Sequence, residues 1–395
     1  MKMNVYMDNA ATTMLSKEVY EKMQPYFMGE YGNASGIYSF AQRSRKAVED
    51  ARQIIGDAIN AKSSEIYFTS GGTESDNWAL KAVADAMEEK GRHIITTKIE
   101  HHAILNTCGY LEKKGFRVTY LDVDSEGRIN LQDLENAIEN DTILISVMFA
   151  NNEIGTIQPV KEIGEIAHRH GIIFHTDAVQ AFGHVKVDVE AYNIDMLSAS
   201  AHKFHGPKGA GFLYIRNGIK IGSYMHGGSQ ERHRRAGTLN VPGIVGMGEA
   251  ARIAVEHMDE SIKYETDLRE YFIGKLKENV PHIKLNGSNS DRLPDNINVC
   301  FKYAPGESAL IMLDRKGIYC SAGSACTSGA MDASHVLLAI GMSEEMAHCS
   351  IRFTISSDTT KEDIDYVVEN VSQIITKLRA MSPLYEHYVQ ETEKQ

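Results

Sequence analysis

An aspartate and a lysine each follow a short apolar run near the middle of this 395-residue chain. Asp177 ends such a run in FHTDAVQ, and Lys203 follows about 26 residues later in LSASAHKFHGPKG. A buried carboxylate is costly unless it is paired, so Asp177 either caps the next helix or meets a cationic ligand group such as a protonated pyridine. A lysine there usually extends to the surface, but in a partly desolvated pocket its neutral amine can form a Schiff base. A pyridoxal enzyme needs both kinds of group: an acid such as Asp177 to pair with the pyridine ring of the cofactor, and a lysine such as Lys203 to bind the cofactor as a Schiff base.

A third segment, TSGGTES at residues 69–75, has the composition of a phosphate-binding turn. Its glycines let backbone N–H groups approach an anion, and the helix expected after it would direct its positive end toward a phosphate. A glycine-rich strand-to-helix turn is more often only a turn, so this segment does not define a site by itself.

Short β-rich runs alternate with helical patterns from residue 65 to about 215. The helical patterns include residues 74–90 and 160–171. Such crossovers predict an α/β fold with a largely parallel sheet covered on both faces, in which ligands bind at the carboxyl ends of the strands. The last two runs are so close together that one of them is expected to run antiparallel. The strand candidates are EIYFTS, RHIITTK, RVTYLDV, TILISVMF, IIFHTDA, MLSASA and GFLYIR.

A second alternation of strand-like and helical patterns occupies the last third of the chain, which is long enough for two domains. Residues 280–301 are strand-like, and helical patterns cover 307–316 and 361–381. We therefore expect a large domain at residues 15–255, with helices near 16–27 and 40–59 packed on its sheet. Residues 1–14 with 256–395 would form the small domain.

Charge and composition limit the class of partner. The formal net charge is −12 and the basic residues are scattered, which argues against nucleic acid and against an anionic membrane. The longest apolar run, at 143–150, is too short to cross a bilayer, and the first residues lack the apolar core of a signal peptide. We expect a cytoplasmic protein with a small-molecule substrate. Its five cysteines are too few and too irregularly spaced for a disulfide framework or a zinc site, so we expect thiols and no metal of its own.

The motifs above occur together with YMDNAATT, EHHA, NNEIG, RRAGTLN and IRFTIS. Jointly they resemble the cysteine desulfurases of the NifS/IscS type, which are class V aminotransferase-like enzymes of fold type I. The similarity covers almost the whole chain. It implies pyridoxal 5'-phosphate (PLP) as the cofactor, a mainly parallel seven-stranded sheet in the large domain, and a smaller α+β domain.

The resemblance also implies roles for individual residues. Lys203 would bind PLP covalently, Asp177 would hold the pyridine nitrogen protonated, and Gln180 would hydrogen-bond the ring hydroxyl. His101 would stack on the ring and shuttle protons. Phosphate would be held by Gly72, Thr73, Ser200 and His202, with Thr238 arriving from a second subunit of a homodimer. Substrate would be bound by Asn33, Asn152 and Arg352, with Asn152 also contacting the ring; without the resemblance, Arg352 reads as a surface arginine on an edge strand.

Cys326 lies in SAGSACTSG, a segment of small residues in which little apolar area can be buried, so we expect a mobile loop. Taken alone, this cysteine reads as a buried thiol in a tight turn. The resemblance implies instead that it takes the sulfur of L-cysteine as a persulfide, releases L-alanine, and passes the sulfur to acceptors such as those of iron–sulfur cluster assembly. A scaffold partner could then borrow Cys326 as a transient iron–sulfur ligand. Four residues depart from the usual family pattern: Ala34, His205, Ser229 and His233.

Two other kinds of function remain open at this point. Within the same fold, the protein could be a selenocysteine lyase, a cysteine sulfinate desulfinase or a related class V aminotransferase. From another class, it could be a scaffold or regulatory protein that has kept the fold without catalysis. The presence of Lys203, Asp177, His101 and Cys326 together argues against the second reading.

Overall fold

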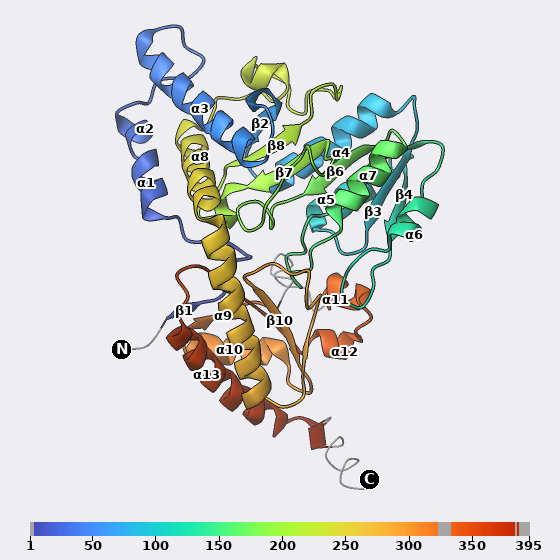
Figure 1. Cartoon of the computed structure of the whole chain (residues 1–395), viewed down its shortest axis with the longest axis vertical. Helices are drawn as coiled ribbons and strands as arrows, with labels where there is room; N and C mark the ends of the chain where they lie inside the picture. The colour runs from blue at the N-terminus through green and yellow to red at the C-terminus, as the bar shows by residue number, and fades with distance from the viewer. Residues whose placement is uncertain (1–3, 323–332, 384, 387–395) are drawn as a thin grey trace.

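The structure, a computed structural model, describes residues 4–322, 333–383 and 385–386, and its main feature is a seven-stranded sheet in the order β2-β8-β7-β6-β5-β3-β4 (Figure 1). Strand β8 runs antiparallel to both of its neighbours, and all other neighbouring pairs are parallel. The expected α/β sheet with one antiparallel strand is therefore confirmed. The strands are β2 (Ile66–Thr69), β3 (His93–Thr97), β4 (Arg117–Leu121), β5 (Thr142–Ser146), β6 (Ile173–Asp177), β7 (Met196–Ser200) and β8 (Gly211–Ile215).

Alternate residues of the sheet pack into two different hydrophobic cores, because successive side chains of a strand point to opposite faces. On β6, for example, Ile173 packs with α4 (Gly72–Met87) and α5 (His102–Glu112), whereas Phe174 packs on the other face. The residues of β6 and β7 that share the face of Ile173 include His175 and Asp177. The helices of the opposite face are α1 (Lys17–Met23), α2 (Pro25–Met28), α3 (Ser39–Ala58), α6 (Leu131–Asn136), α7 (Val160–Arg169) and α8 (Val241–Glu256).

A second, smaller set of elements has a hydrophobic core of its own. Its antiparallel sheet has the order β12-β10-β9, and the N-terminal β1 pairs in parallel with β11. Figure 1 shows α9 passing from the end of α8 down alongside this sheet, next to α13. The elements are β1 (Val5–Tyr6), α9 (Met258–Asn279), β9 (Ile283–Leu285), β10 (Asn296–Phe301), α10 (Gly306–Arg315), β11 (Ile318–Tyr319), β12 (Ser350–Thr354) and α13 (Lys361–Arg379). The short helices α11 (His335–Ala339) and α12 (Glu344–Ala347) pack in a further small cluster.

The helices of the described residues are all too short or too polar to cross a bilayer. The predicted helix near 16–27 divides at Pro25 into α1 and α2, and Ser16 caps α1 by accepting the N–H of Val19. The strand-like region at 280–301 forms two strands, β9 and β10.

Candidate active site

A cavity of about 390 Å³ lies at the carboxyl ends of β6 and β7. Ten of the residues proposed from the sequence line it, from six separate segments of the chain. Asn33 and Thr238 do not line it and are exposed, and Cys326 lies outside the described residues. The lining residues are Ala10, Ala11, Gly72, Thr73, Asp76, His101, Met148, Ala150, Asn152, Asp177, Val179, Gln180, Ser200, His202, Lys203 and Arg352.

Asp177 is the last residue of β6 and is almost fully buried at one side of the cavity. Its Oδ1 accepts the backbone N–H of Val179 at 2.9 Å. Burial raises the pKa of Asp177, while His101, the Val179 N–H and Lys203 act in the opposite direction. A buried carboxylate in this position is stabilised by any further cation brought next to it, which favours the ligand-pairing role over a capping role alone.

Lys203 follows β7 in the 3₁₀ turn Ala201–Lys203 and reaches the N-terminal segment of the chain. Its Nζ donates to the carbonyl oxygens of Ala10 at 2.6 Å and Ala11 at 2.9 Å. Gln180 Nε2 also donates to Ala10, at 3.0 Å. The carbonyls of this segment thus orient the lysine amine, a role that the sequence did not indicate because backbone groups carry no residue signal.

The first turn of α4 forms another wall of the cavity. Gly71 has φ of 152°, a conformation that side-chain-bearing residues rarely adopt. A Cβ on Gly72 would lie 2.5 Å from Val179 Cγ2, so this close approach requires glycine. The N–H groups at a helix start have no partner inside the helix and suit an anion. His202 also lines the cavity, and burial with two nearby lysines lowers its pKa to about 4, so it is neutral at pH 7.

His101 precedes α5 and caps it, because its Nδ1 accepts the N–H of Ala103 at 3.1 Å. Burial is the largest influence on its pKa, which is lowered. A neutral ring that accepts at Nδ1 carries its proton on Nε2. His101 can therefore exchange a proton with a group in the cavity without leaving its helix cap.

Arg352 lies on β12 and is only 2% exposed. Its Nη1 donates to the carbonyl of Asn152 and its Nη2 to Asp8 Oδ1, each at 2.8 Å. Its Nε has no hydrogen-bond partner among the described residues. The reading of Arg352 as a surface arginine is wrong, because the side chain is buried and lines the cavity.

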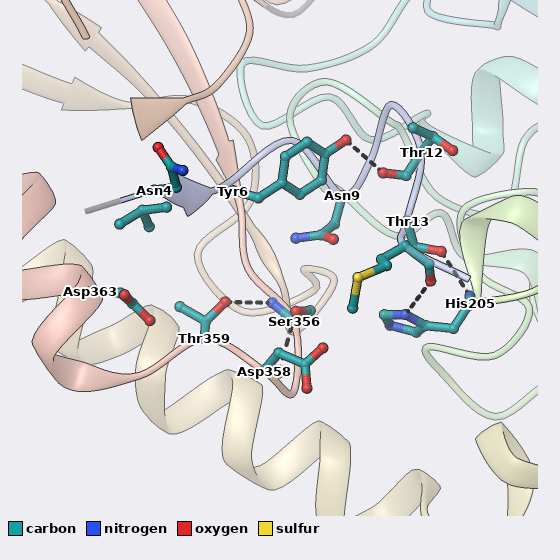
Figure 2. A pocket seen from close by; sticks show the side chains of 12 residues that line it. Asn4, Tyr6, Asn9, Thr12, Thr13, His205, Ser356, Asp358, Thr359 and Asp363 are labelled. Atoms are coloured by element: carbon teal, nitrogen blue, oxygen red, sulfur yellow. Dashed lines mark hydrogen bonds between the residues drawn. The ribbon is translucent and has the colours of Figure 1, made fainter. Parts of the chain in front are cut away.

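The N-terminal segment with Asp8, Ala10 and Ala11 also borders a second cavity, of about 480 Å³ (Figure 2). Hydrogen bonds near this second cavity hold the segment in place. Tyr6 OH donates to the carbonyl of Thr12 at 2.7 Å. The backbone N–H of His205 donates to Thr13 Oγ1 at 2.8 Å, and its ring Nδ1 lies 3.0 Å from the carbonyl of Met14. These contacts place the N-terminal segment against the turn that follows Lys203.

The loop before Thr238 contains three consecutive residues with left-handed backbone, Glu231, Arg232 and His233, at φ of 43°, 57° and 65°. His233 stands where the family pattern has glycine, the residue that adopts this conformation without strain. Glu231 holds the loop in place, because both of its oxygens accept from the Arg52 guanidinium at 2.7 Å. It also accepts the N–H of Phe68 at 2.8 Å.

We expect Glu231→Gln to lower the free energy of unfolding by about 3–5 kcal/mol, because it removes the buried carboxylate that pairs with Arg52 and leaves that charge only the exposed Glu49. The measurement is urea unfolding followed by circular dichroism. Asp50→Asn is the matched control: it breaks an exposed ion pair with Lys46 on α3 and should cost less than about 1 kcal/mol. Equal effects of the two substitutions would show that Glu231 does not anchor the loop.

The aminotransferase class-V family matches residues 5–367 of the chain. The cysteine desulfurase IscS of Clostridium botulinum strain Hall is 54% identical over 396 residues, which cover 100% of both chains. The protein of that name from Methanosarcina thermophila is 56% identical over 381 residues, 96% of this chain and 94% of the relative. A solved NifS-like protein superposes with a TM-score of 0.90 at 39% identity, covering 95% of this chain and 100% of its own. A structure described as SspA in complex with cysteine gives a TM-score of 0.81 at 39% identity, covering 90% and 100%.

The chain therefore belongs to the aminotransferase class-V family, whose enzymes use PLP. Within that family, its relatives place it in the cysteine desulfurase branch.

The residues of the cavity fit PLP. A buried carboxylate in need of a cation, Asp177, lines the same cavity as a primary amine, Lys203. The open first turn of α4 is suited to a phosphate. PLP has a basic ring nitrogen, an aldehyde and a phosphate, so each end of the cofactor has a matching group.

Proposed function

We propose that this protein is a cysteine desulfurase that converts L-cysteine and its own Cys326 thiol into L-alanine and a Cys326 persulfide. The observation that carries the proposal is the convergence of Lys203, Asp177 and Arg352, from distant parts of the chain, on one cavity. The 54% identity to cysteine desulfurases over the full length supports it.

PLP bound here would supply an electron-accepting ring that weakens the bonds at the substrate Cα. The chain's own groups hold and orient the reactants. Lys203 supplies the amine for covalent attachment, Asp177 keeps the ring nitrogen protonated, and Gln180 contacts the ring hydroxyl. Gly72, Thr73, Ser200 and His202 hold the phosphate.

Arg352 and Asn152 line the same cavity and position the substrate. Arg352 binds the carboxylate of L-cysteine with the donors that face the cavity, and Asn152, whose carbonyl fixes Arg352, contacts both the ring and the substrate. Asn33 is exposed in this chain, and its contact with substrate remains a prediction.

His101 moves the proton that sulfur transfer requires. A cysteine thiol is mostly protonated at neutral pH, so Cys326 must lose its proton before it can attack the substrate sulfur. His101 is neutral and lines the cavity, which makes it the group of this chain best placed to take that proton.

The persulfide sulfur would pass to an acceptor protein, for example in iron–sulfur cluster assembly, where a scaffold could use Cys326 as a transient cluster ligand. The enzyme would act as a homodimer in which Thr238, exposed in this chain, completes the partner's phosphate site. Four free cysteines among the described residues fit a reducing compartment, so we place the protein in the cytoplasm.

The predicted domain division, 15–255 against 1–14 with 256–395, is also a proposal. It is supported by the separate hydrophobic core of β1, β10, β12, α9 and α13. The pairing of β1 with β11 supports the assignment of the first residues to the small domain.

The test of the proposed function is incubation of the PLP-loaded protein with L-cysteine and a thiol reductant. We expect alanine and sulfide in equal amounts and, without reductant, one added sulfur on the peptide that contains Cys326, mapped by mass spectrometry. Pyruvate and ammonia in place of alanine, or alanine without sulfur on any thiol, would overturn the proposal.

We expect Arg352→Lys to raise KM for L-cysteine by about 10- to 100-fold, with a smaller effect on kcat. A charged hydrogen bond contributes about 1.5–3 kcal/mol, and a lysine ammonium cannot reproduce the fork of an arginine. Steady-state alanine formation measures both constants. Arg252→Lys, on the exposed face of α8, is the control and should leave KM unchanged. An unchanged KM in Arg352→Lys would place the substrate carboxylate elsewhere.

A further inference from the structure

A buried polar cluster lies behind Asp177, on the face of the sheet covered by α4. Asp76, one turn into α4, is 1% exposed and was not singled out from the sequence. One oxygen of Asp76, one of Asp177 and one ring nitrogen of His101 all lie within 4.8 Å of one another. Glu100, fully buried before α5, also acts electrostatically on both aspartates.

Three buried carboxyl groups this close together cannot all be ionised, because like charges disfavour one another and burial disfavours every charge. Lys203 is a positive group that acts on Asp177, whereas burial lowers the pKa of His101 and leaves its ring neutral. Glu100 accepts the hydroxyl of Thr97 at 2.8 Å and the N–H of Met148 at 2.9 Å. Asp76 has less support: Ser198 interacts with its carboxyl group, but among the described residues its Oδ1 has no hydrogen-bond partner.

Asp76 also lies next to Ser198 and to His175, and His175 in turn contacts the hydroxyl groups of Ser198 and Ser146. His175 Nε2 lies 3.0 Å from Ser198 Oγ and 3.7 Å from Asp76 Oδ1, and its Nδ1 lies 2.9 Å from Ser146 Oγ. Burial lowers the pKa of His175 to about 3, so its ring is uncharged at pH 7. Burial first, and then Asp177, raise the pKa of Asp76 well above its ordinary value.

These groups can form one directional chain of hydrogen bonds if Asp76 carries a proton. The Asp76 carboxyl group interacts with Ser198 and would donate to its Oγ. Ser198 would then donate to Nε2 of His175, and Nδ1–H of His175 would donate to Ser146. Every polar hydrogen in the chain then has an acceptor. An ionised Asp76 could accept through the same groups in the reverse order, but it would place a second buried anion beside Asp177, which burial and like charge both disfavour.

We propose that Asp76 is a positioning residue for the cofactor: as a protonated carboxyl group held by Ser198 and His175, it leaves Asp177 as the single anion directed at the pyridine nitrogen. The inference rests on the PLP site proposed above. An ionised Asp76 behind Asp177 would make it harder for Asp177 to be ionised. It would also be a second base near the protonated ring nitrogen of PLP. Asp76 acts through Asp177 and does not touch the reacting atoms.

Infrared difference spectroscopy of the PLP-loaded protein tests the protonation state directly. Subtracting the spectrum of Asp76→Asn from that of the unchanged protein at neutral pH should leave the carbonyl stretch of a protonated carboxylic acid. Glu100→Gln is the matched control. The pKa of Glu100 is raised to about 8, so Glu100 is also protonated at neutral pH and its carbonyl band must be distinguished from that of Asp76. If Asp76→Asn removes a carboxylate band instead, Asp76 is ionised and the proposal fails.

The dissociation constant of PLP tests the positioning role. Asparagine is neutral and can still donate to Ser198, so Asp76→Asn should bind PLP within about threefold of the unchanged protein. Leucine is neutral but cannot donate, and Asp76→Leu should bind roughly tenfold more weakly, the effect of about one lost hydrogen bond. Equal affinities of the two variants would reduce Asp76 to a space-filling residue. Neither measurement involves turnover, so a protein that binds PLP but forms no alanine would overturn the desulfurase proposal and not this one.

Discussion

Lys203→Ala should abolish the covalent attachment of PLP and lower alanine formation from L-cysteine by a factor on the order of 10³ or more. Among the described residues that line the cavity, Lys203 is the one primary amine, and the carbonyls of Ala10 and Ala11 direct it. The cavity itself should survive, because alanine removes no group that supports β7. PLP should therefore still bind, but without a covalent bond.

Borohydride reduction followed by peptide mass mapping measures the attachment, since reduction makes the lysine–cofactor bond permanent. Lys208→Ala is the matched control: Lys208 lies in the same glycine–proline turn but is exposed, and its loss should leave both attachment and alanine formation unchanged. Cofactor fixed to another lysine in Lys203→Ala would show that the assignment of the attachment site is wrong.

The proximity of Asp177 and Lys203 could be predicted from the sequence. Both lie at or just after the ends of strands that the alternation of β-rich runs and helical patterns identifies. Asp177 pairs with Ser198 in the register of β6 and β7, so the two strands end at one edge of the sheet. The general rule that α/β sheets bind ligands at that edge then locates the cavity. Local patterns carry this information because each strand and its crossover are continuous in sequence.

The contacts that complete the site could not be predicted in the same way. Arg352 and Asp8 are 344 positions apart, and Arg52 and Glu231 are 179 apart. No local pattern reports which distant segments meet, so Arg352 resembled a surface residue until β12 was seen next to the N-terminal segment. The family resemblance supplied its role but not its partner.

Asp76 is a different case, because the sequence contained a signal that was not used. It follows Gly72 by four residues in the expected helix, and residues at that spacing lie on the same side. Once Gly72 is assigned to the cofactor, Asp76 must lie close behind it. A carboxylate on a face expected to be buried then requires a partner or a proton.

Cys326→Ala should stop persulfide formation and lower alanine formation by a factor on the order of 10³, while L-cysteine still binds. Cys326 lies outside the described residues, so the structural argument comes from the other four cysteines. Burial raises the pKa of Cys108 and of Cys300 to about 12. It also raises the pKa of Cys320 and Cys349. The thiolate is the nucleophile, so these four thiols are poor acceptors of sulfur at neutral pH.

Cys320 is the matched control for this prediction, because Asp8 and Arg352 act on its thiol electrostatically and it is thus near the proposed substrate carboxylate site. Cys320→Ala should retain both the persulfide and alanine formation. Mass mapping of the two variants after reaction with L-cysteine distinguishes the thiols. A persulfide on Cys320 in Cys326→Ala, with alanine formed at the original rate, would reassign the acceptor to a buried thiol. Because burial holds Cys320 in its protonated form, that result would require the site to open around Cys320 during the reaction.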